Sequence, residues 1–270
     1  MNPFDKQIHK DDFRLRLLVT NGCNKNCHHC LNDFQPKPRN RMRFLDPKLA
    51  RGIIKEYCLL MAPKAQVEIS GGEPGIYPYL GDLVGQAKIF GGSVKVNTNG
   101  MAFSWGIEDC VDRWHIGVTK CDRHLAEKTK EVGGQIQFVV ISETPNRIRS
   151  IVEFYGSYGI PIKLFVDFFA YGEEKKEIEG AIKAVIGLYP NLDITTRYTG
   201  VQENRGAWCD GCNKKCITLK ALWVFPDGRV SPCPQGIIPP KTFHPGDIEL
   251  VRLGHLKKEI QNDIEEKAAR

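Results

Sequence analysis

Residues 13–30 have the sequence FRLRLLVTNGCNKNCHHC, in which a strand-forming segment leads directly into three cysteines. The segment Phe13–Thr20 is rich in branched apolar residues and ends in small polar ones, which is typical of a β-strand that opens into a loop. In parallel α/β folds, the loops after the strands build the active site. Cys23, Cys27 and Cys30 therefore stand where a functional site is expected.

Strand-like and helix-like segments alternate through the middle of the chain, which predicts an α/β fold with a parallel sheet and right-handed crossovers. The predicted strands are Phe13–Thr20, Gln66–Ser70, Ser93–Asn97, Trp114–Thr119, Gln135–Ile141 and Ile160–Phe168. The predicted helices are Asp46–Met61, Pro78–Phe90, Asp122–Glu131, Asn146–Tyr158 and Glu173–Leu188. Six β/α units are too few for an eight-fold barrel, so we expect a partial (β/α)6 barrel of the TIM type.

The composition changes after Pro190, where Pro, Gly and Cys become frequent. The segment ALWVFPDGRVSPC, residues 221–233, predicts a β-hairpin with Asp-Gly at its turn. A final helix is expected over about Leu256–Lys267. We therefore expect two domains, a partial barrel over residues 1–190 and a small cysteine-rich extension with a C-terminal helix over residues 191–270.

Composition favours a globular protein of the cytoplasm. The chain has 270 residues, of which 41% are hydrophobic and 26% are charged. It has no apolar stretch long enough to cross a membrane, and its first residues lack the pattern of a signal peptide. Ten cysteines in a reducing compartment indicate metal binding where they cluster, because disulfides are rare there.

The charge pattern allows an anionic partner. The formal net charge is +6, and the densest basic run contains Lys37, Arg39, Arg41 and Arg43. Such a run is typical of a solvated loop, and binding of an anionic substrate is the functional alternative.

Three thiolates on one short loop can bind three irons of a cubane iron–sulfur cluster and leave the fourth iron without a protein ligand. An open coordination position is typical of a reactive metal site. The alternative is zinc, with His28 or His29 as a fourth ligand to Cys23, Cys27 and Cys30.

Two further segments follow predicted strands. Gly71-Gly72-Glu73-Pro74 comes directly after the second strand, and Asn97-Thr98-Asn99-Gly100 follows the third. Together with the C-x3-C-x2-C spacing of Cys23, Cys27 and Cys30, these segments resemble the motifs of the radical S-adenosylmethionine (radical SAM) superfamily. The resemblance extends over roughly residues 13–170.

This resemblance implies that the three cysteines hold a [4Fe–4S] cluster whose open iron binds S-adenosylmethionine (SAM). In the family, reductive cleavage of SAM gives a 5′-deoxyadenosyl radical that abstracts hydrogen from substrate. His29 occupies the position of the aromatic residue that lies against the adenine in relatives. The positions expected to bind SAM are His29, Gly71, Gly72, Glu73, Asn97, Thr98, Asn99 and Thr119.

A second group contains Cys209, Cys212, Cys216 and Cys233, with Gly228 ahead of the last of them. Its spacing resembles the SPASM and Twitch extensions of radical SAM enzymes, which implies a second [4Fe–4S] cluster. Four thiolates are equally suited to a structural zinc ion. The spacing alone does not distinguish a [4Fe–4S] cluster from a zinc ion.

The resemblance implies an enzyme of oxidoreductase or transferase type that acts on a small molecule or a peptide. Its partners would include a reductant such as flavodoxin or ferredoxin, and neither nucleic acid nor a membrane is an expected partner. The family's molybdopterin enzyme ends in Gly-Arg-Arg, whereas this chain ends in EEKAAR, which favours another reaction. The alternatives are a zinc-binding nucleic-acid module and an iron–sulfur protein that only carries electrons.

Overall fold

A ten-stranded sheet forms the centre of the structure, a computed structural model that describes residues 13–27, 30, 42–141, 145–167, 170, 172–197, 221–231 and 241–243. The strand order is β10-β9-β8-β1-β2-β3-β4-β5-β6-β7. The strands are β1 (Arg14–Leu18), β2 (Gln66–Ser70), β3 (Ser93–Thr98), β4 (Arg113–Val118), β5 (Gln135–Val140), β6 (Ile162–Val166), β7 (Ile194–Arg197), β8 (Ala221–Val224), β9 (Arg229–Ser231) and β10 (Lys241–Thr242).

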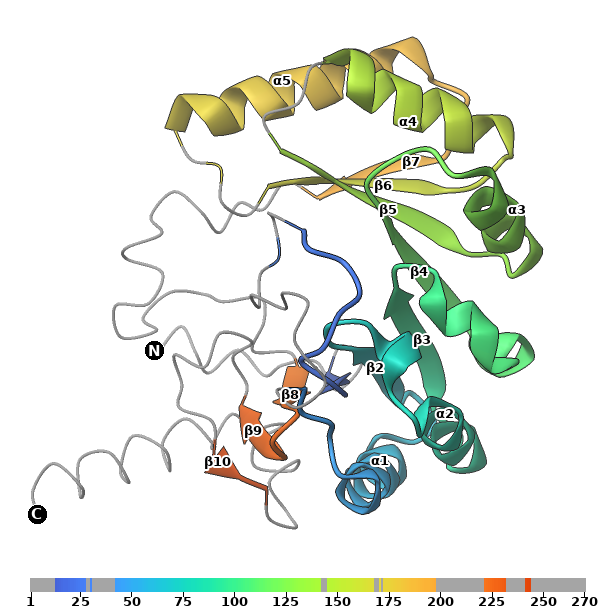
Figure 1. The fold of residues 1–270 in the computed structure, drawn as a ribbon, viewed down its shortest axis with the longest axis vertical. Helices are drawn as coiled ribbons and strands as arrows, with labels where there is room; N and C mark the ends of the chain where they lie inside the picture. Colours follow the sequence, from blue (N-terminus) through green and yellow to red (C-terminus); the bar gives the residue numbers. More distant parts are fainter. Residues whose placement is uncertain are drawn as a thin grey trace, which may run out of the picture.

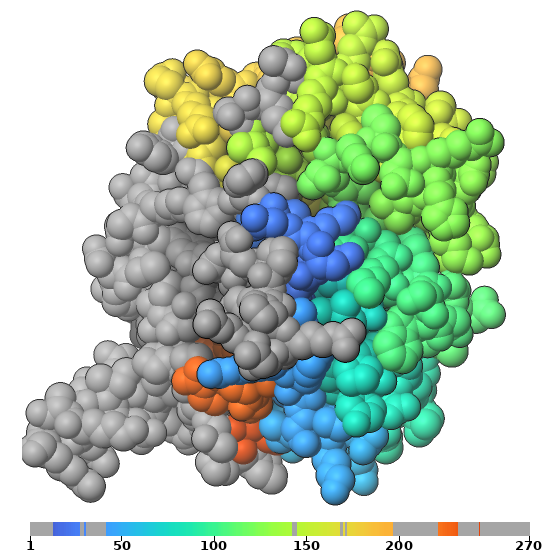
Figure 2. All heavy atoms as spheres, viewed as in Figure 1, coloured from blue at the N-terminus to red at the C-terminus, as the bar shows by residue number. Residues whose placement is uncertain are grey.

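Strands β1 to β7 are parallel and pair in chain order, so each crossover moves the chain one strand along the sheet. Five α-helices lie on the same side of the sheet, and their colours follow one another along the surface in the space-filling view (Figures 1 and 2). They are α1 (Pro47–Met61), α2 (Leu80–Ile89), α3 (Arg123–Glu131), α4 (Pro145–Ser157) and α5 (Gly172–Leu188). The predicted α/β class with a mainly parallel sheet is confirmed.

The two predicted helix starts at aspartate are confirmed. Asp46 Oδ1 accepts a hydrogen bond of 2.7 Å from the Leu49 amide at the start of α1, and Asp122 Oδ1 accepts one of 3.0 Å from the Leu125 amide at the start of α3. Each carboxylate satisfies an amide that the first helical turn leaves unpaired. None of the helices in the described part of the chain has both the length and the apolar composition needed to span a bilayer.

Alternation along the strands separates the core from the inner face of the sheet. Every second strand residue is apolar and fully buried beneath the helices, and the core includes Leu15, Leu17, Val67, Ile69, Val94, Val96, Ile116, Ile136, Val140, Ile162 and Leu164. The intervening residues point to the opposite side because side chains alternate along a strand. Many of them are polar or charged, so the main apolar core of the described residues lies on one face of this sheet, and a small cluster of Leu18, Ala221 and Trp223 lies apart from it.

The crossover between β3 and β4 differs from the others. It contains two 3₁₀ helices, η4 (Met101–Trp105) and η5 (Glu108–Cys110), where the other crossovers contain an α-helix. A shorter 3₁₀ helix, η3 (Pro74–Ile76), follows β2. The Trp105 indole donates a hydrogen bond of 2.8 Å to the Gly75 carbonyl, which joins η4 to η3.

The predicted hairpin at residues 221–233 is confirmed for its described part. Strands β8 and β9 are antiparallel, and Gly228 has a φ of +81° at the turn between them. Strand β8 also pairs in parallel with β1, so the hairpin continues the sheet. Strand β7 was not predicted, because its sequence ITTR contains a single strongly apolar residue.

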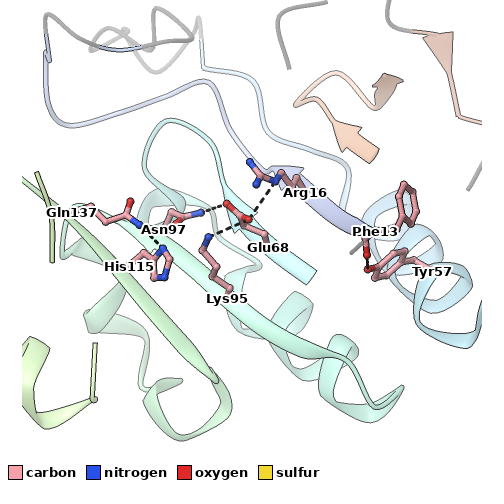
Figure 3. Close-up of polar contacts among 8 residues, drawn as sticks. All are labelled: Phe13, Arg16, Tyr57, Glu68, Lys95, Asn97, His115 and Gln137. Atoms are coloured by element: carbon pink, nitrogen blue, oxygen red, sulfur yellow. Dashed lines mark hydrogen bonds and ion pairs between the residues drawn. The ribbon is translucent and has the colours of Figure 1, made fainter. Parts of the chain in front are cut away.

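Tyr57 joins the first two strands from the centre of α1. Its buried hydroxyl donates a hydrogen bond of 2.8 Å to the Phe13 carbonyl, as Figure 3 shows. It also accepts one of 3.0 Å from the Gln66 amide. It thus satisfies one backbone group ahead of β1 and another at the start of β2.

Replacing Tyr57 with phenylalanine should leave both backbone groups buried without a partner. The expected loss of stability is about 1–3 kcal/mol, visible as a fall of several degrees in the melting temperature of the intact protein. Tyr79→Phe is the control, because Tyr79 is 43% exposed and should change stability by less than about 0.5 kcal/mol. Equal melting temperatures for the two variants would contradict the structural role of the Tyr57 hydroxyl.

Candidate active site

A cavity of about 660 Å³ lies against the inner face of the sheet and is lined by residues of β1 to β6 and of the loops after β1 to β4. Its size is in the range of small-molecule and cofactor sites. The structure brings together at this cavity the following residues that the sequence analysis selected: Cys23, Cys27, Cys30, Gly71, Gly72, Glu73, Asn97, Thr98, Asn99 and Thr119. The carboxyl ends of adjacent parallel strands thus bring three separate motifs to one site.

The glycine pair after β2 packs directly against the chain that leads into the cysteine loop. The Gly72 amide donates a hydrogen bond of 2.8 Å to the Thr20 carbonyl, and the Glu73 amide donates one of 2.8 Å to the Gly22 carbonyl. A Cβ atom on Gly72 would lie 1.9 Å from the Gly22 carbonyl oxygen. Gly71 has a φ of +142°, which side chains disfavour. The immediate reason for glycine is therefore close packing of backbone on backbone.

Glu73 connects the glycine turn to the segment after β3. Its Oε1 accepts hydrogen bonds of 2.8 Å from the Gly75 amide and 2.6 Å from the Thr98 hydroxyl, and its Oε2 accepts one of 2.7 Å from the Asn99 amide. The residue is 1% exposed, and burial raises the pKa of its carboxyl in spite of these hydrogen bonds. A carboxylate has about four acceptor positions, so three donors leave one at Oε2, beside the cavity that Glu73 lines.

Asn99 joins the segment after β3 to the cysteine loop. Its side-chain amide donates a hydrogen bond of 2.6 Å to Asn24 Oδ1, and Lys25 Nζ donates one of 3.4 Å to the Asn99 carbonyl. Asn97 points toward β2 and donates a hydrogen bond of 2.7 Å to Glu68 Oε1. The Thr119 carbonyl accepts a hydrogen bond of 2.9 Å from Arg147, which holds the end of β4.

The three cysteine thiols are partly buried and line the same cavity. The Cys30 amide donates a hydrogen bond of 3.1 Å to the Cys27 carbonyl, and the Lys25 amide donates one of 3.4 Å to Cys23 Sγ. Burial raises the pKa of the Cys23 and Cys27 thiols, and the positive charge of Lys25 acts in the opposite direction on Cys27. Bound iron would favour the thiolate forms.

A cluster and a single metal ion place different demands on the positions of these thiols. Among the described residues, no three His, Cys, Asp or Glu side chains form a group suited to one metal ion. A cubane places each cysteine on a different iron, so its ligands need not converge on one point. The three thiols that line the cavity are compatible with that chemistry.

Other predicted site residues fall elsewhere. His28, His29, Lys37, Arg39, Arg41, Cys209, Cys212, Cys216 and Cys233 lie outside the described residues. Arg43 is exposed and does not line the cavity, and its amide donates a hydrogen bond of 2.7 Å to Asn21 Oδ1. Arg43 thus contacts the segment before Cys23 through its backbone amide and not through its charged side chain.

A set of polar residues on the inner face, shown in Figure 3, was not predicted from the sequence. They are Arg16, Glu68, Lys95, His115 and Gln137, on β1 to β5 respectively. Parallel strands covered on both faces are usually apolar throughout. The alternation of polar and apolar residues in RLRLL, QVEIS, SVKVNT and RWHIGV was the available signal for a polar inner face.

Glu68 lies at the centre of this set. Its Oε2 is 3.3 Å from Arg16 Nε and 3.2 Å from Lys95 Nζ, and the residue is 7% exposed. Burial opposes ionisation, but the charges of Arg16 and Lys95 prevail and hold the pKa of Glu68 below its usual range. The Arg16 guanidinium also lies over the Trp223 ring of β8, 4.7 Å from the ring centre.

His115 stays neutral at ordinary pH. Burial, reinforced by the charge of Lys95, lowers its pKa to about 3. Its Nδ1 atom contacts the side-chain amide of Gln137, and a neutral imidazole with Nδ1 as acceptor carries its proton on Nε2. His115 therefore supplies a neutral donor among the charged groups of the cavity.

The sequence model of the family described as "Radical SAM superfamily" matches residues 17–185. This chain belongs to the radical SAM superfamily. Membership implies a [4Fe–4S] cluster and SAM as cofactors, and the cysteine loop, the glycine turn and Glu73 all lie within the matched residues.

Curated relatives match a smaller part of the chain. GTP 3′,8-cyclase of Vibrio vulnificus (strain YJ016) is 33% identical over 82 residues, which are 30% of this chain and 24% of that protein. GTP 3′,8-cyclase of Actinobacillus pleuropneumoniae serotype 5b (strain L20) is 32% identical over 108 residues, 39% of this chain and 30% of that protein. The matched stretch is thus less than a third of either relative.

Solved structures share the fold over most of the chain. Streptococcus suis SuiB bound to S-adenosylmethionine superposes with a TM-score of 0.65 at 15% identity, over 90% of this chain and 66% of SuiB. The enzyme anSMEcpe with bound AdoMet and Cp18Cys peptide superposes with a TM-score of 0.57 at 13% identity, over 82% of this chain and 74% of that one. These likenesses support the partial barrel expected from the sequence.

The packing of the glycine turn predicts a sharp effect of Gly72→Ala. The new methyl group would collide with the Gly22 carbonyl and displace the start of the cysteine loop, at a cost of about 2–4 kcal/mol. Gly85→Ala on α2 is the matched control, because its Cβ would meet nothing within 4 Å. Melting temperature and bound iron should fall in the first variant and be retained in the second. Retention of both in Gly72→Ala would contradict this packing.

The low pKa of His115 predicts a pH dependence of stability. The unfolded chain takes up a proton at this residue below about pH 6.5, whereas the folded protein does so only near pH 3, so acid favours unfolding. Between pH 7 and pH 5 the free energy of unfolding of the wild type should therefore fall by about 1–2 kcal/mol more than that of His115→Gln. Melting temperatures of cluster-loaded protein at the two pH values test this, with His124→Gln on the exposed side of α3 as control. An equal fall in melting temperature in the wild type and in His115→Gln would refute the low pKa of His115.

Proposed function

We propose that this chain is a radical SAM enzyme that abstracts hydrogen from a small-molecule or peptide substrate and is of oxidoreductase or transferase type. When bound, the [4Fe–4S] cluster and SAM supply a 5′-deoxyadenosyl radical through reductive cleavage of SAM. The observation that carries the proposal is the meeting of the cysteine loop, the glycine turn and the segment after β3 at one cavity. Glu73 joins two of these segments by direct hydrogen bonds.

The proposed roles follow from the contacts of each residue. Cys23, Cys27 and Cys30 hold the cluster. Glu73 uses its remaining acceptor position on Oε2 to bind the amino group of SAM, since the residue lines the cavity. Asn99 holds the glycine turn next to the cysteine loop through its hydrogen bonds to Glu73 and Asn24.

Further polar groups at the carboxyl edge are proposed to bind the cofactor. Asn97, Thr98 and Thr119 line the cavity at the ends of β3 and β4. The Thr98 hydroxyl donates to Glu73 and accepts from the Gly100 and Ala102 amides at 3.1 and 3.2 Å, so its main effect is on the position of Glu73. Thr119 retains its hydroxyl for a ligand, and His29 is proposed to lie against the adenine.

We propose that Cys209, Cys212, Cys216 and Cys233 bind a second [4Fe–4S] cluster in a Twitch-like domain of residues 191–270, beside a radical SAM domain of residues 1–190. The support is the number and spacing of these cysteines in the sequence. A structural zinc ion is the alternative. A reductant such as flavodoxin or ferredoxin would supply electrons, and the clusters suit the reducing cytoplasm.

Iron, sulfide and zinc analysis of anaerobically purified protein tests this assignment. We expect about eight irons and eight sulfides per chain, falling to about four of each when Cys23, Cys27 and Cys30 are replaced with alanine. The triple variant should also lose formation of 5′-deoxyadenosine from SAM under dithionite. Cys110→Ala, at an exposed residue outside the cavity, should match the wild type in both readouts.

The metal content distinguishes the alternatives. About four irons with one zinc would retain the radical enzyme and refute the second cluster. Zinc alone after anaerobic reconstitution, with no cleavage of SAM, would refute the proposed function and favour a zinc-binding module.

A further inference from the structure

The inner face of the sheet carries more positive than negative charge. Among the described residues that line the cavity, six are basic and two are acidic. The basic residues are Arg14, Arg16, Lys25, Lys95, Arg113 and Lys163, and the acidic residues are Glu68 and Glu73. His115 adds no charge, because its pKa lies near 3. A concave site lined mainly by one sign of charge attracts ligands of the opposite sign.

Four of these charged residues form a row across adjacent strands. Arg16 pairs in register with Glu68, Glu68 with Lys95, and Lys95 with Arg113. Directly paired residues of neighbouring strands project to the same face. The row therefore places three cations and one carboxylate side by side on β1 to β4, as Figure 3 shows for the first three.

Glu68 compensates only part of this charge. It forms ion pairs with Arg16 and Lys95, and it accepts a hydrogen bond from Asn97. Arg16 additionally stacks on Trp223, so Glu68 and Trp223 hold its guanidinium from two sides. Arg113 has no acidic partner among the described residues, and the Lys95 side chain is 21% exposed. Arg113 is exposed, so its guanidinium is accessible to an anion, and Lys95 shares its counterion Glu68 with Arg16.

The row lies away from the carboxyl ends of the strands where the cysteine loop and the glycine turn meet. Arg113 begins β4 and Thr119 directly follows its end, and six residues of strand span about 20 Å. His115 lies between them on the same face, with its Nε2 proton as a further donor. A ligand anchored at the row and extending along β4 would bring its other end to the carboxyl edge.

From this arrangement we propose that the substrate is a small molecule with a carboxylate or phosphate group, which binds Lys95, Arg113 and His115 on the inner face while its reacting carbon faces the cofactor edge. The inference rests on the proposed function, since it assumes that the substrate shares the cavity with SAM. The basic run of Arg39, Arg41 and Arg43 stays a separate prediction from the sequence. A cavity of about 660 Å³ is in the size range of small-molecule sites, which favours a small substrate over an extended peptide.

Calorimetric titration of the cluster-loaded full chain tests the site, with inorganic pyrophosphate, inorganic phosphate and succinate as probes at matched ionic strength. Arg113→Gln is the main variant because it leaves no acidic side chain of the described residues unpaired. We expect it to weaken binding of the preferred probe by about tenfold or more, the effect of one lost charged hydrogen bond. Lys95→Met should act in the same direction.

Lys130→Met, at an exposed position on α3, is the matched control and should bind the probes within about twofold of the wild type. Preference for pyrophosphate or phosphate over succinate would assign a phosphoryl group to the substrate, and the reverse preference a carboxylate. Absence of binding to the wild type, or unchanged binding in both Arg113→Gln and Lys95→Met, would overturn the proposal. Displacement of the probe by SAM would also overturn it, because the cations would then belong to the cofactor site.

Formation of 5′-deoxyadenosine in the absence of substrate separates this inference from the proposed function. Arg113→Gln should still form 5′-deoxyadenosine but should bind the anionic probes more weakly. That result would support both the radical SAM function and the anion site. Loss of SAM cleavage in the wild type, with anion binding still dependent on Arg113, would refute the radical chemistry and leave the anion site in place.

Discussion

The carboxylate of Glu73 is the contact on which the site depends. It is almost fully buried and accepts hydrogen bonds from the glycine turn, from Thr98 and from the Asn99 amide. Loss of a buried acceptor leaves its donors unpaired, at a cost of about 1–3 kcal/mol for each. One side chain therefore holds the ends of β2 and β3 in a fixed relation, and through Asn99 and Asn24 it also holds the cysteine loop.

Close backbone packing makes this arrangement possible. Gly72 lies against Gly22, and a Cβ on Gly75 would lie 2.6 Å from the Ala102 amide nitrogen. Both glycines flank Glu73 and allow the turn to approach two neighbouring segments at once. The motif thus combines steric and electrostatic requirements: glycine for the approach of the backbone, and a carboxylate for the amides that this approach brings together.

The sheet has a different design on its two faces. Beneath the helices it is apolar and excludes water, whereas its inner face carries a charged row centred on Glu68. Buried ion pairs contribute little net stability, because desolvation offsets their attraction. The proposed anionic ligand gives the row of Arg16, Glu68 and Lys95 a role other than stability of the fold. The same strands therefore build the apolar core and the cavity, with alternate residues pointing to each.

The sequence by itself determined the alternation of β1 to β6 with the five α-helices, the helix starts at Asp46 and Asp122, the hairpin turn at Gly228 and the membership of the superfamily. Periodicity, capping residues and motifs are local signals, and β7 was missed because ITTR lacks such a signal. Only the tertiary structure decided that Glu73 binds Thr98 and Asn99, that β8 pairs with β1 and that the polar strand residues form a row. Pairing register and side-chain proximity arise between segments far apart in the chain, and no local pattern records which residues become neighbours.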